Sequence, residues 1–437
     1  MTKCIAPALE FPRCQRRRVQ AEFNGGAISS DGGVVLLRQV DRRLGLLAAV
    51  DRVLPDPRDP RLIEHRQLNL LRQRVYGLCL GYEDLNDHTT LRIDPALQTA
   101  VERTEVLASP ATLCRLENRA DRQTMWRIHE VLMEQFIASF QTPPTELVLD
   151  FDATDDPVHG RQEGRFFHGY YDSYCFLPLY VFCGDQLLVS YLRSSNRDGA
   201  HHAWAILALL VKRLRRAWPT VRLIFRGESG FCRWRLLAWC ERHAVAYIVG
   251  IAKNARLNRL AEPYLHQAAQ VVAETGQPHR HFAEVESAAD SWDRPRRILV
   301  KAEQTLQGAN PRYVVTTLLG DPQSLYETVY CSRGEMENRI KEQQLDLFAD
   351  RTSCHDGWAK QFRLLLASLA YSLMEALRRL ALPGTELAQA CVGTLRLKLL
   401  KIGAVIVRNT RRICFHLSSA YPYQPLFQHV VAQLEFG

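Results

Sequence analysis

Several features that would define other classes of protein are missing from the sequence. No apolar run reaches the roughly 18 residues that a membrane-spanning helix needs. No apolar segment follows the basic residues Arg16, Arg17 and Arg18, as it would in a signal peptide. The 12 cysteines include no C-x-x-C pair, which argues against zinc-knuckle and thioredoxin-like sites and favours reduced, mostly buried thiols. We therefore expect a cytoplasmic protein with no membrane partner.

Lysine is also scarce, because it supplies only eight of the 56 basic residues and arginine supplies the rest. Arginine binds phosphate through a planar, bidentate fork, although a GC-rich genome would also favour arginine over lysine. The net charge of +9 favours a polyanionic partner such as nucleic acid. With 437 residues, of which 47% are apolar and 24% are charged, the chain is long enough for two or three globular domains.

The spacing of apolar residues changes along the chain and divides it into segments. Residues 1–22 form a basic arm, and residues 23–143 show mostly helical spacing. Within them, 110–136 is typical of a helix-turn-helix or of an ordinary helical bundle. A boundary with two prolines at 141–144 precedes an α/β region. The remaining segments are a core at 144–253 and 327–385, an insertion with a helix and a small β-ribbon at 254–326, and a basic C-terminal segment at 386–437.

The core segment alternates between strand and helix patterns. Its predicted order is three strands, a helix, a strand, a helix and a strand, at 147–151, 176–182, 187–192, 201–218, 221–225, 233–243 and 245–251. Three strands that can pair as a meander, followed by alternating helices, predict a mixed α/β sheet. Further helices are predicted at 330–347 and 358–380.

Acidic residues stand where two of these strands end. Asp150 and Asp152 are two residues apart, so they share one face of the first strand, and a cation between them would relieve their repulsion. Oxygen ligands of this kind suit Mg²⁺ or Mn²⁺, although a polar strand end with Asx-turns has the same composition. Glu228 lies in the turn Arg-Gly-Glu-Ser-Gly-Phe at 226–231, where it is either exposed for ligand binding or caps the next helix.

A third group of charged residues lies on the predicted helix at 330–347. Arg333, Glu337 and Lys341 are spaced by four residues and share one face, and Tyr330 lies about one turn earlier. An exposed ladder of ion pairs would have the same spacing. The acids thus occur on the first strand, after the fourth strand and on a helix behind the sheet. This order and topology are together typical of a ribonuclease H-like fold.

On these residues the chain resembles bacterial insertion-sequence transposases of the DDE type, in the group with the signature Y-(2)-R-(3)-E-(6)-K. The resemblance rests on Asp152-Ala-Thr154, the run Arg-Phe-Phe-His-Gly-Tyr-Tyr at 165–171, the turn at 226–231, and Tyr330, Arg333 and Glu337.

Two positions depart from the pattern of this group. Gln344 stands where the signature has lysine, so Lys341 and Arg339 are the candidate substitutes. Glu228 stands where aspartate is usual, and its additional methylene shifts a carboxylate that Mg²⁺ would hold in near-octahedral geometry. Because a misplacement of about 1 Å can cost about 10²-fold in rate, the fold is the firmer implication and the activity depends on Glu228.

The resemblance implies a cut-and-paste DNA transposase with a ribonuclease H-like core, a β-rich insertion and a helical DNA-binding domain at 23–143. It implies two Mg²⁺ or Mn²⁺ ions bound by Asp152, Glu228 and Glu337, with Asp150 as the reserve ligand. The residues implied to contact DNA are Tyr330, Arg333, Lys341, Arg339 and Arg226, with Trp292 as a candidate for stacking on an extruded base. The implied partners are transposon ends and target DNA, bound by a homodimer in the bacterial cytoplasm at the nucleoid.

Three alternatives to an active transposase stay open at this point. A metal-dependent nuclease or resolvase on the same core would cleave DNA without joining strands. A transposase relic would bind inverted repeats without cutting them, and Glu228 is the reason to consider it. A helix-rich transcription factor without a catalytic core is disfavoured by the ordered acids at the strand ends.

Overall fold

The computed structural model describes residues 8–158, 160, 162–351, 354 and 356–435, so the first seven residues of the expected basic arm lie outside the described residues. The chain divides into two compact units. Unit 1 comprises the chain up to residue 51, residues 56–116 and the chain from residue 376 onwards, and unit 2 comprises 52–55 and 117–375. The acids identified from the sequence all lie in unit 2.

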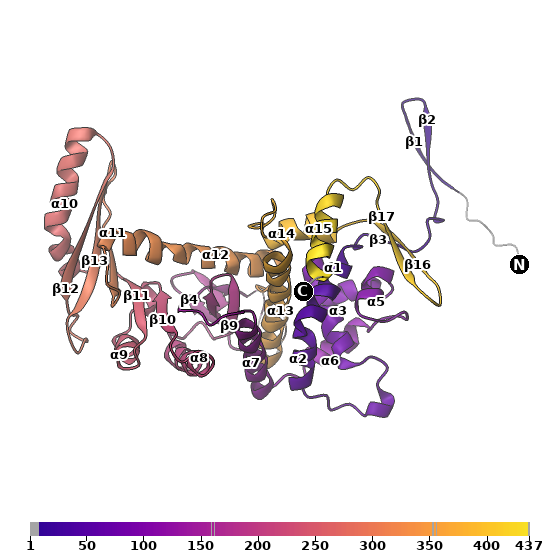
Figure 1. Ribbon diagram of the computed structural model, residues 1–437, viewed down its shortest axis with the longest axis horizontal. Coiled ribbons are helices and arrows are strands. Elements are labelled where there is room, and N and C mark those ends of the chain that lie inside the picture. Colours follow the sequence, from indigo (N-terminus) through magenta and orange to yellow (C-terminus); the bar gives the residue numbers. More distant parts are fainter. Residues whose placement is uncertain (1–7, 159, 161, 352–353, 355, 436–437) are drawn as a thin grey trace, which may run out of the picture. The chain divides into compact units, whose positions relative to one another are not determined.

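Unit 2 is built on a mixed sheet of nine strands (Figure 1). The strand order is β12-β13-β15-β11-β10-β4-β8-β9, with β14 paired to β13. The strands are β4 (Glu146–Ala153), β8 (Leu179–Cys183), β9 (Gln186–Tyr191), β10 (Arg222–Gly227), β11 (Ala246–Ile251), β12 (His279–Ser287), β13 (Arg296–Thr305), β14 (Gly308–Ala309) and β15 (Arg312–Thr316). β4, β10 and β11 are parallel, and β8 and β9 continue from β4 as an antiparallel meander. The order β9-β8-β4-β10-β11 is that of a ribonuclease H-like sheet, so the predicted mixed α/β sheet is confirmed.

Alternation along the strands explains why helices cover both faces of this sheet. The helices of unit 2 are α7 (Arg122–Ala138), α8 (Ala203–Ala217), α9 (Trp234–Arg242), α10 (Ala255–Thr275), α11 (Pro322–Ser324), α12 (Gly334–Lys341) and α13 (Gly357–Ala381), the last of which continues into unit 1. Leu149 and Phe151 of β4 pack on α7, α8 and α9. Ile224 of β10 points to the opposite face, where it packs with Leu325 and Tyr326. Figure 1 shows α8 and α9 on one side of the sheet and α12 on the other.

Residues 322–346 form one helical segment of changing pitch. Wide π-helical turns at Leu325–Tyr330 and Glu342–Asp346 flank a tight turn at Cys331–Arg333 and the α-helix α12. The segment begins after Asp321, whose carboxylate accepts a hydrogen bond of 2.8 Å from the backbone N–H of Ser324. The helix predicted at 330–347 is confirmed, with an earlier start. The structure also confirms the long apolar helix predicted at 358–380, which is α13. Among the described residues, no helix combines the length and the apolar character needed to cross a bilayer.

The insertion contains the predicted helix, α10, and the two predicted strand runs, which lie in β13 and β15. Its strands do not form a separate ribbon, because β15 pairs antiparallel with β11 and so extends the core sheet. β12 was not anticipated from the sequence. Its residues are mostly half-exposed and polar, so they lack the apolar alternation of a core strand. The apolar side of α10 packs against β12 and β13.

A short excursion leaves the sheet between β4 and β8. It forms a small sheet of β5 (Asp156–Pro157), β7 (Ser173–Phe176) and β6 (Phe166–His168), in the order β5-β7-β6. The single strand predicted at 176–182 is therefore divided into β7 and β8. Pro178 lies at the division, where its missing N–H and fixed φ interrupt a strand.

Unit 1 combines the helices of the N-terminal half with the last part of the chain. Its main elements are β1 (Leu9–Cys14), β2 (Arg17–Ala21), β3 (Ile28–Ser29), α1 (Val34–Leu44), α2 (Leu46–Val53), α3 (Gln67–Leu80), α4 (His88–Leu91), α5 (Pro95–Ala100), α6 (Pro110–Glu117), α14 (Val392–Leu395), β16 (Ala404–Arg408), β17 (Ile413–Leu417) and α15 (Gln424–Glu435). Two helices occupy 110–136 as predicted, but the second, α7, packs on β9 in unit 2. The basic arm contains an exposed antiparallel hairpin, β1–β2.

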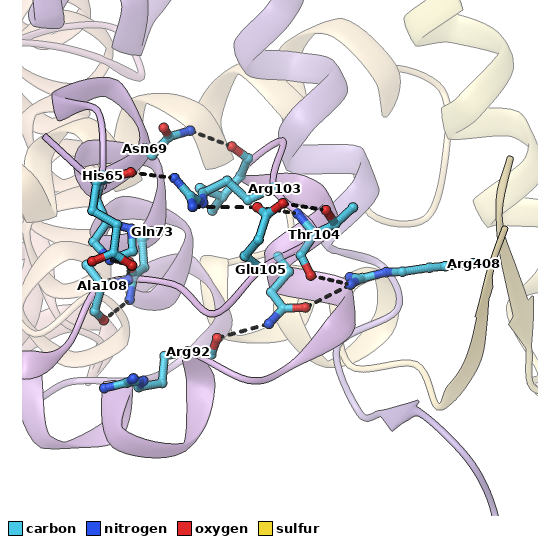
Figure 2. Close-up of polar contacts among 12 residues, drawn as sticks. His65, Asn69, Gln73, Arg92, Arg103, Thr104, Glu105, Ala108 and Arg408 are labelled. Atoms are coloured by element: carbon cyan, nitrogen blue, oxygen red, sulfur yellow. Dashed lines mark hydrogen bonds and ion pairs between the residues drawn. The ribbon is translucent and has the colours of Figure 1, made fainter. Parts of the chain in front are cut away.

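Backbone pairing and arginine contacts hold the basic C-terminal segment within unit 1. β16 pairs with β3 as well as with β17. Arg408 at the end of β16 donates to the side-chain oxygen of Gln98 at 2.8 Å and to the backbone oxygen of Thr104 at 3.2 Å (Figure 2). Gln98 in turn donates to the backbone oxygen of Arg92 at 3.1 Å. These hydrogen bonds give Arg408 a structural role within unit 1.

Candidate active site

The two-residue period of the strands places the acids on the face of the sheet that the helical segment 322–346 covers. In β4, Leu149 and Phe151 point into the core under α8 and α9, so Asp150 and Asp152 point to the opposite face. β10 is parallel to β4, with Arg226 directly opposite Asp150. Glu228 follows the last residue of β10 and begins a tight helical turn at Ser229–Phe231.

Asp150 and Arg226 form a buried ion pair below the strand ends. The guanidinium of Arg226 contacts both carboxylate oxygens of Asp150, with a distance of 2.7 Å from Nη2 to Oδ2. It also donates to the backbone oxygen of Val329 in the helical segment. Burial raises the pKa of Asp150, and the adjacent Arg226 opposes that rise. This pair thus links β4, β10 and the helical segment. The sequence suggested Asp150 as a reserve metal ligand and Arg226 as a DNA contact, and in the structure both side chains are engaged in this ion pair.

The three acids of the candidate site meet around Arg333. Nη1 of Arg333 lies 3.4 Å from Oδ2 of Asp152, and Nη2 donates to Oε1 of Glu337 one turn along the helix. Glu228 interacts electrostatically with both Arg333 and Glu337. Asp152 is almost completely buried, whereas Glu228 and Glu337 are partly exposed. The structure therefore brings together side chains that are 76 and 109 residues apart in the sequence.

Burial and mutual repulsion perturb the protonation of these acids. Burial raises the pKa of Asp152 to about 7, Arg333 counteracts this, and the charges of Glu228 and Glu337 add to it. Burial also raises the pKa of Glu228, again opposed by Arg333 and assisted by Glu337. Perturbed carboxyl groups gathered at the carboxyl ends of parallel strands are typical of a functional site.

The donor set fits a hard divalent cation such as Mg²⁺ or Mn²⁺, because all its ligand atoms are carboxylate oxygens and their repulsion is relieved by positive charge. Among the described residues, however, no three acidic, histidine or cysteine side chains are already placed as ligands of one metal ion. The guanidinium of Arg333 supplies the positive charge between Asp152 and Glu337 in this conformation.

Tyr330 reaches the site because Gly250 leaves room for it. A Cβ atom on Gly250 would lie 2.5 Å from the hydroxyl of Tyr330 and 3.0 Å from the backbone nitrogen of Ser229. Any other residue in this position of β11 would displace the tyrosine or the turn that carries Glu228. Sequence reasoning missed Gly250, although a glycine inside a predicted strand is the signal of such a close approach.

Tyr171 is a second residue that the sequence analysis did not assign to the site. Its hydroxyl donates to the backbone oxygen of Ala153 at 3.4 Å. Burial and the carboxylates of Asp155, Glu228 and Asp152 raise the pKa of its phenol. The run at 165–171 that contributed to the resemblance therefore ends beside the acids.

The remaining residues implied by the resemblance lie in different surroundings. Lys341 is exposed on α12. Arg339 is bound by Asp185, at 2.8 Å, and by Glu342. The side-chain nitrogen of Gln344 donates to the backbone oxygen of Asp155 at 2.9 Å, so Gln344 anchors the helical segment beside the acids.

Trp292 was suggested as a platform for an extruded base, but the structure packs it between two apolar clusters of unit 2. The guanidinium of Arg296 lies over its ring, 5.2 Å from the centroid. Trp292 is half-buried, so part of its ring serves packing in unit 2, and its proposed contact with an extruded base stays a prediction.

Comparisons with known proteins connect this chain to a described family. The family model described as transposase DDE domain group 1 matches residues 11–436. No curated protein matches the chain. Among solved structures, the synaptic complex of piggyBac transposase with hairpin DNA is similar with a TM-score of 0.38 and 11% sequence identity, over 90% of this chain and 88% of that chain.

The ion pair of Asp150 and Arg226 predicts an asymmetric effect of substitution. Arg226→Met leaves a buried carboxylate without its cation and is expected to lower the free energy of unfolding of unit 2 by about 3–5 kcal/mol. Denaturant-induced unfolding monitored by tryptophan fluorescence measures this change. Asp150→Asn in the same chain should recover most of the loss.

The matched control is Arg222→Met, which removes the exposed ion pair of Arg222 and Glu146 on the same two strands. We expect it to cost less than about 1 kcal/mol. Equal effects of Arg222→Met and Arg226→Met would contradict the assigned role of the buried pair.

The raised pKa of Asp152 predicts a pH-dependent stability of the metal-free protein. The folded state holds the proton of Asp152 up to a pH of about 7, and the unfolded chain releases it near the ordinary value of 3.8. Stability is therefore lost as the pH rises from about 4 to about 7. Asp152→Asn cannot ionise, so it is expected to be more stable than the wild type at pH 8, by up to about 4 kcal/mol, and nearly equal to it at pH 4.

Thermal unfolding at the two pH values in the presence of a chelator measures this difference. Glu335→Gln, which changes an exposed acid on α12, serves as the control and should have little effect at either pH. A wild-type protein more stable than Asp152→Asn at pH 8 would show that the assigned protonation is wrong.

Proposed function

The chain belongs to the family described as transposase DDE domain group 1, and from this membership and the geometry of the acid site we propose that it is a DNA transposase of the bacterial insertion-sequence type. In this proposal, a homodimer binds the terminal inverted repeats of its element and cleaves and joins DNA strands by phosphoryl transfer. The observation that carries it is the meeting of Asp152, Glu228 and Glu337 around one cation at the ends of β4 and β10.

The proposed reaction has two steps on phosphodiesters. Water attacks phosphorus at the transposon end, and the bond to the 3′ oxygen breaks and leaves a 3′-hydroxyl. That hydroxyl then attacks a phosphodiester of the target DNA and displaces another 3′ oxygen. Asp152, Glu228 and Glu337 would hold divalent cations, whose chemistry is to lower the pKa of the attacking hydroxyl and to stabilise charge on the phosphate.

Other side chains of the site would hold the DNA backbone. The guanidinium of Arg333 contacts Asp152 and Glu337. A metal ion bound by these acids would take the place of the guanidinium, which would then be free to bind a phosphate. Tyr330 offers a hydroxyl at the same edge, and Lys341 is exposed on the same helix. Phosphate contacts of this kind fix the position of the substrate. Arg226 and Arg339 are occupied by acids, so the proposal assigns them to positioning the site.

A second candidate, a relic that binds DNA without cutting it, is favoured by two observations. Glu228 replaces the usual aspartate, and the described part of the chain holds no three ligands already converged on one metal position. Substitution of Glu228 separates this candidate from the first.

Removal of either flanking acid is expected to abolish cleavage and leave DNA binding intact. We expect Asp152→Ala and Glu337→Ala to lower the rate of cleavage by about 10³-fold or more, because they remove a metal ligand worth several kcal/mol. The substrate is a labelled duplex with the terminal sequence of the element that encodes the chain, with Mg²⁺ and then Mn²⁺. Glu335→Ala, on the same helix, is the matched control. Full activity in either acid variant would refute the site.

Shortening Glu228 gives opposite results for the two candidates. In an active enzyme whose site is built around glutamate, Glu228→Asp moves the carboxylate by about 1 Å and is expected to lower the cleavage rate by up to about 10²-fold. A relic would instead show no wild-type cleavage and a large gain with Glu228→Asp. The same cleavage assay distinguishes the two by the sign of the change.

A further inference from the structure

The hairpin of β6 and β7 exposes aromatic side chains that the proposed chemistry does not use. Phe166, Phe167, Tyr170 and Tyr174 are 43%, 53%, 84% and 50% exposed. Aromatic residues of this size usually contribute to a core or an interface. Four exposed aromatic residues within the eleven-residue hairpin at 166–176 therefore indicate that this surface binds a partner.

One face of this hairpin is an aromatic surface in which neighbouring rings meet edge to face, with a cation beside it. Phe167 and Tyr174 are directly paired across the two strands, and their ring centroids lie 5.6 Å apart. The guanidinium of Arg165 lies 4.6 Å from the centroid of the Tyr174 ring. Rings with an arginine of this kind bind the faces of nucleobases, which are flat and aromatic, and the phosphates that connect them.

The loop of the same hairpin is continuous with the acid site. Tyr170 and Tyr171 are neighbours with ring centroids 5.0 Å apart. Tyr171 turns inward and bonds to the backbone of Ala153, next to Asp152. Tyr170, in contrast, turns outward to solvent. A base stacked on Tyr170 would therefore lie within a short stretch of backbone from the phosphate that the acids hold.

We propose that the hairpin of β6 and β7 stacks unpaired bases at the DNA end that the acids cleave. This inference rests on the proposed function and adds to it a single-stranded feature of the substrate. Bases within a duplex are already stacked on each other, so the surface selects bases that have left the duplex. The position of the surface beside the acids favours DNA over a protein partner.

The test measures binding of DNA ends without cleavage, using the full-length protein with a chelator. Two duplexes carry the same terminal sequence, one fully paired and one with three mismatched terminal bases that include 2-aminopurine. We expect the wild type to prefer the mismatched end and to quench its fluorescence by stacking. Tyr170→Ala and Phe167→Ala should each reduce the preference by about fivefold to 100-fold, the effect of losing one base-stacking contact.

Two further variants make the result specific to the rings of the hairpin. Tyr170→Phe keeps the ring and should retain both preference and quenching. Trp204→Ala removes an aromatic side chain of α8 that is 53% exposed, outside the hairpin, and should change neither. Because Tyr170 is itself largely exposed, its replacement should not disturb folding.

The outcomes separate this inference from the function on which it rests. A protein that binds both duplexes but keeps its preference and quenching in Tyr170→Ala and Phe167→Ala overturns the stacking surface alone. A protein that binds neither duplex overturns the proposed function. Reduced self-association of the two variants, with an unchanged preference for unpaired bases, would assign the hairpin to a protein contact and also overturn the inference.

Discussion

The contact between Arg226 and Asp150 is the interaction on which the arrangement of the candidate site depends. The two residues are opposite each other on parallel strands, two positions before Glu228 and Asp152, so their pairing sets the relative height of the acids that follow. The same guanidinium binds the carbonyl of Val329 and so fixes the helical segment that carries Tyr330, Arg333 and Glu337. One buried cation thereby connects the three elements of the candidate site. A neutral residue in its place would leave Asp150 charged in a dry environment.

A second arginine determines the charge balance at the surface above this pair. Arg333 contacts Asp152 and Glu337, and its charge opposes the rise in the pKa values of Asp152 and Glu228. Three acids in a partly buried position need a cation. The arginine supplies it in this conformation, and in the proposed reaction divalent ions would replace it. Asp150 and Asp152 are thus neighbours with different roles, because one is paired within the fold and the other faces the site.

Much of the core could be predicted from the sequence, because its signals are local. Apolar alternation identified β4, β9, β10 and β11, helical spacing identified α8, α9 and α13, and their order predicted the sheet. The acids were identified from strand ends and from four-residue spacing on a helix. Their convergence on Arg333 depends on tertiary packing and was not visible in the sequence.

Other features depend on contacts that are distant in sequence. The pairing of β15 with β11 and the polar strand β12 extend the sheet, but neither has a distinct local pattern. The π-helical turns at Leu325–Tyr330 are not distinguished by composition from an α-helix. The positions of Gly250 and Tyr171 beside the acids follow from the packing of the helix and the hairpin on the sheet.

The continuous sheet has a mechanical consequence. Backbone hydrogen bonds run without interruption from β12 at the outer edge of the insertion to β11 and β10, the strand that precedes Glu228. Such a sheet resists sliding of adjacent strands past each other. The insertion and the acid site therefore move as one body rather than as two modules joined by a hinge. A force that acts on α10 or β12 would therefore twist the whole sheet. The carboxylates at the strand ends would rotate with the sheet.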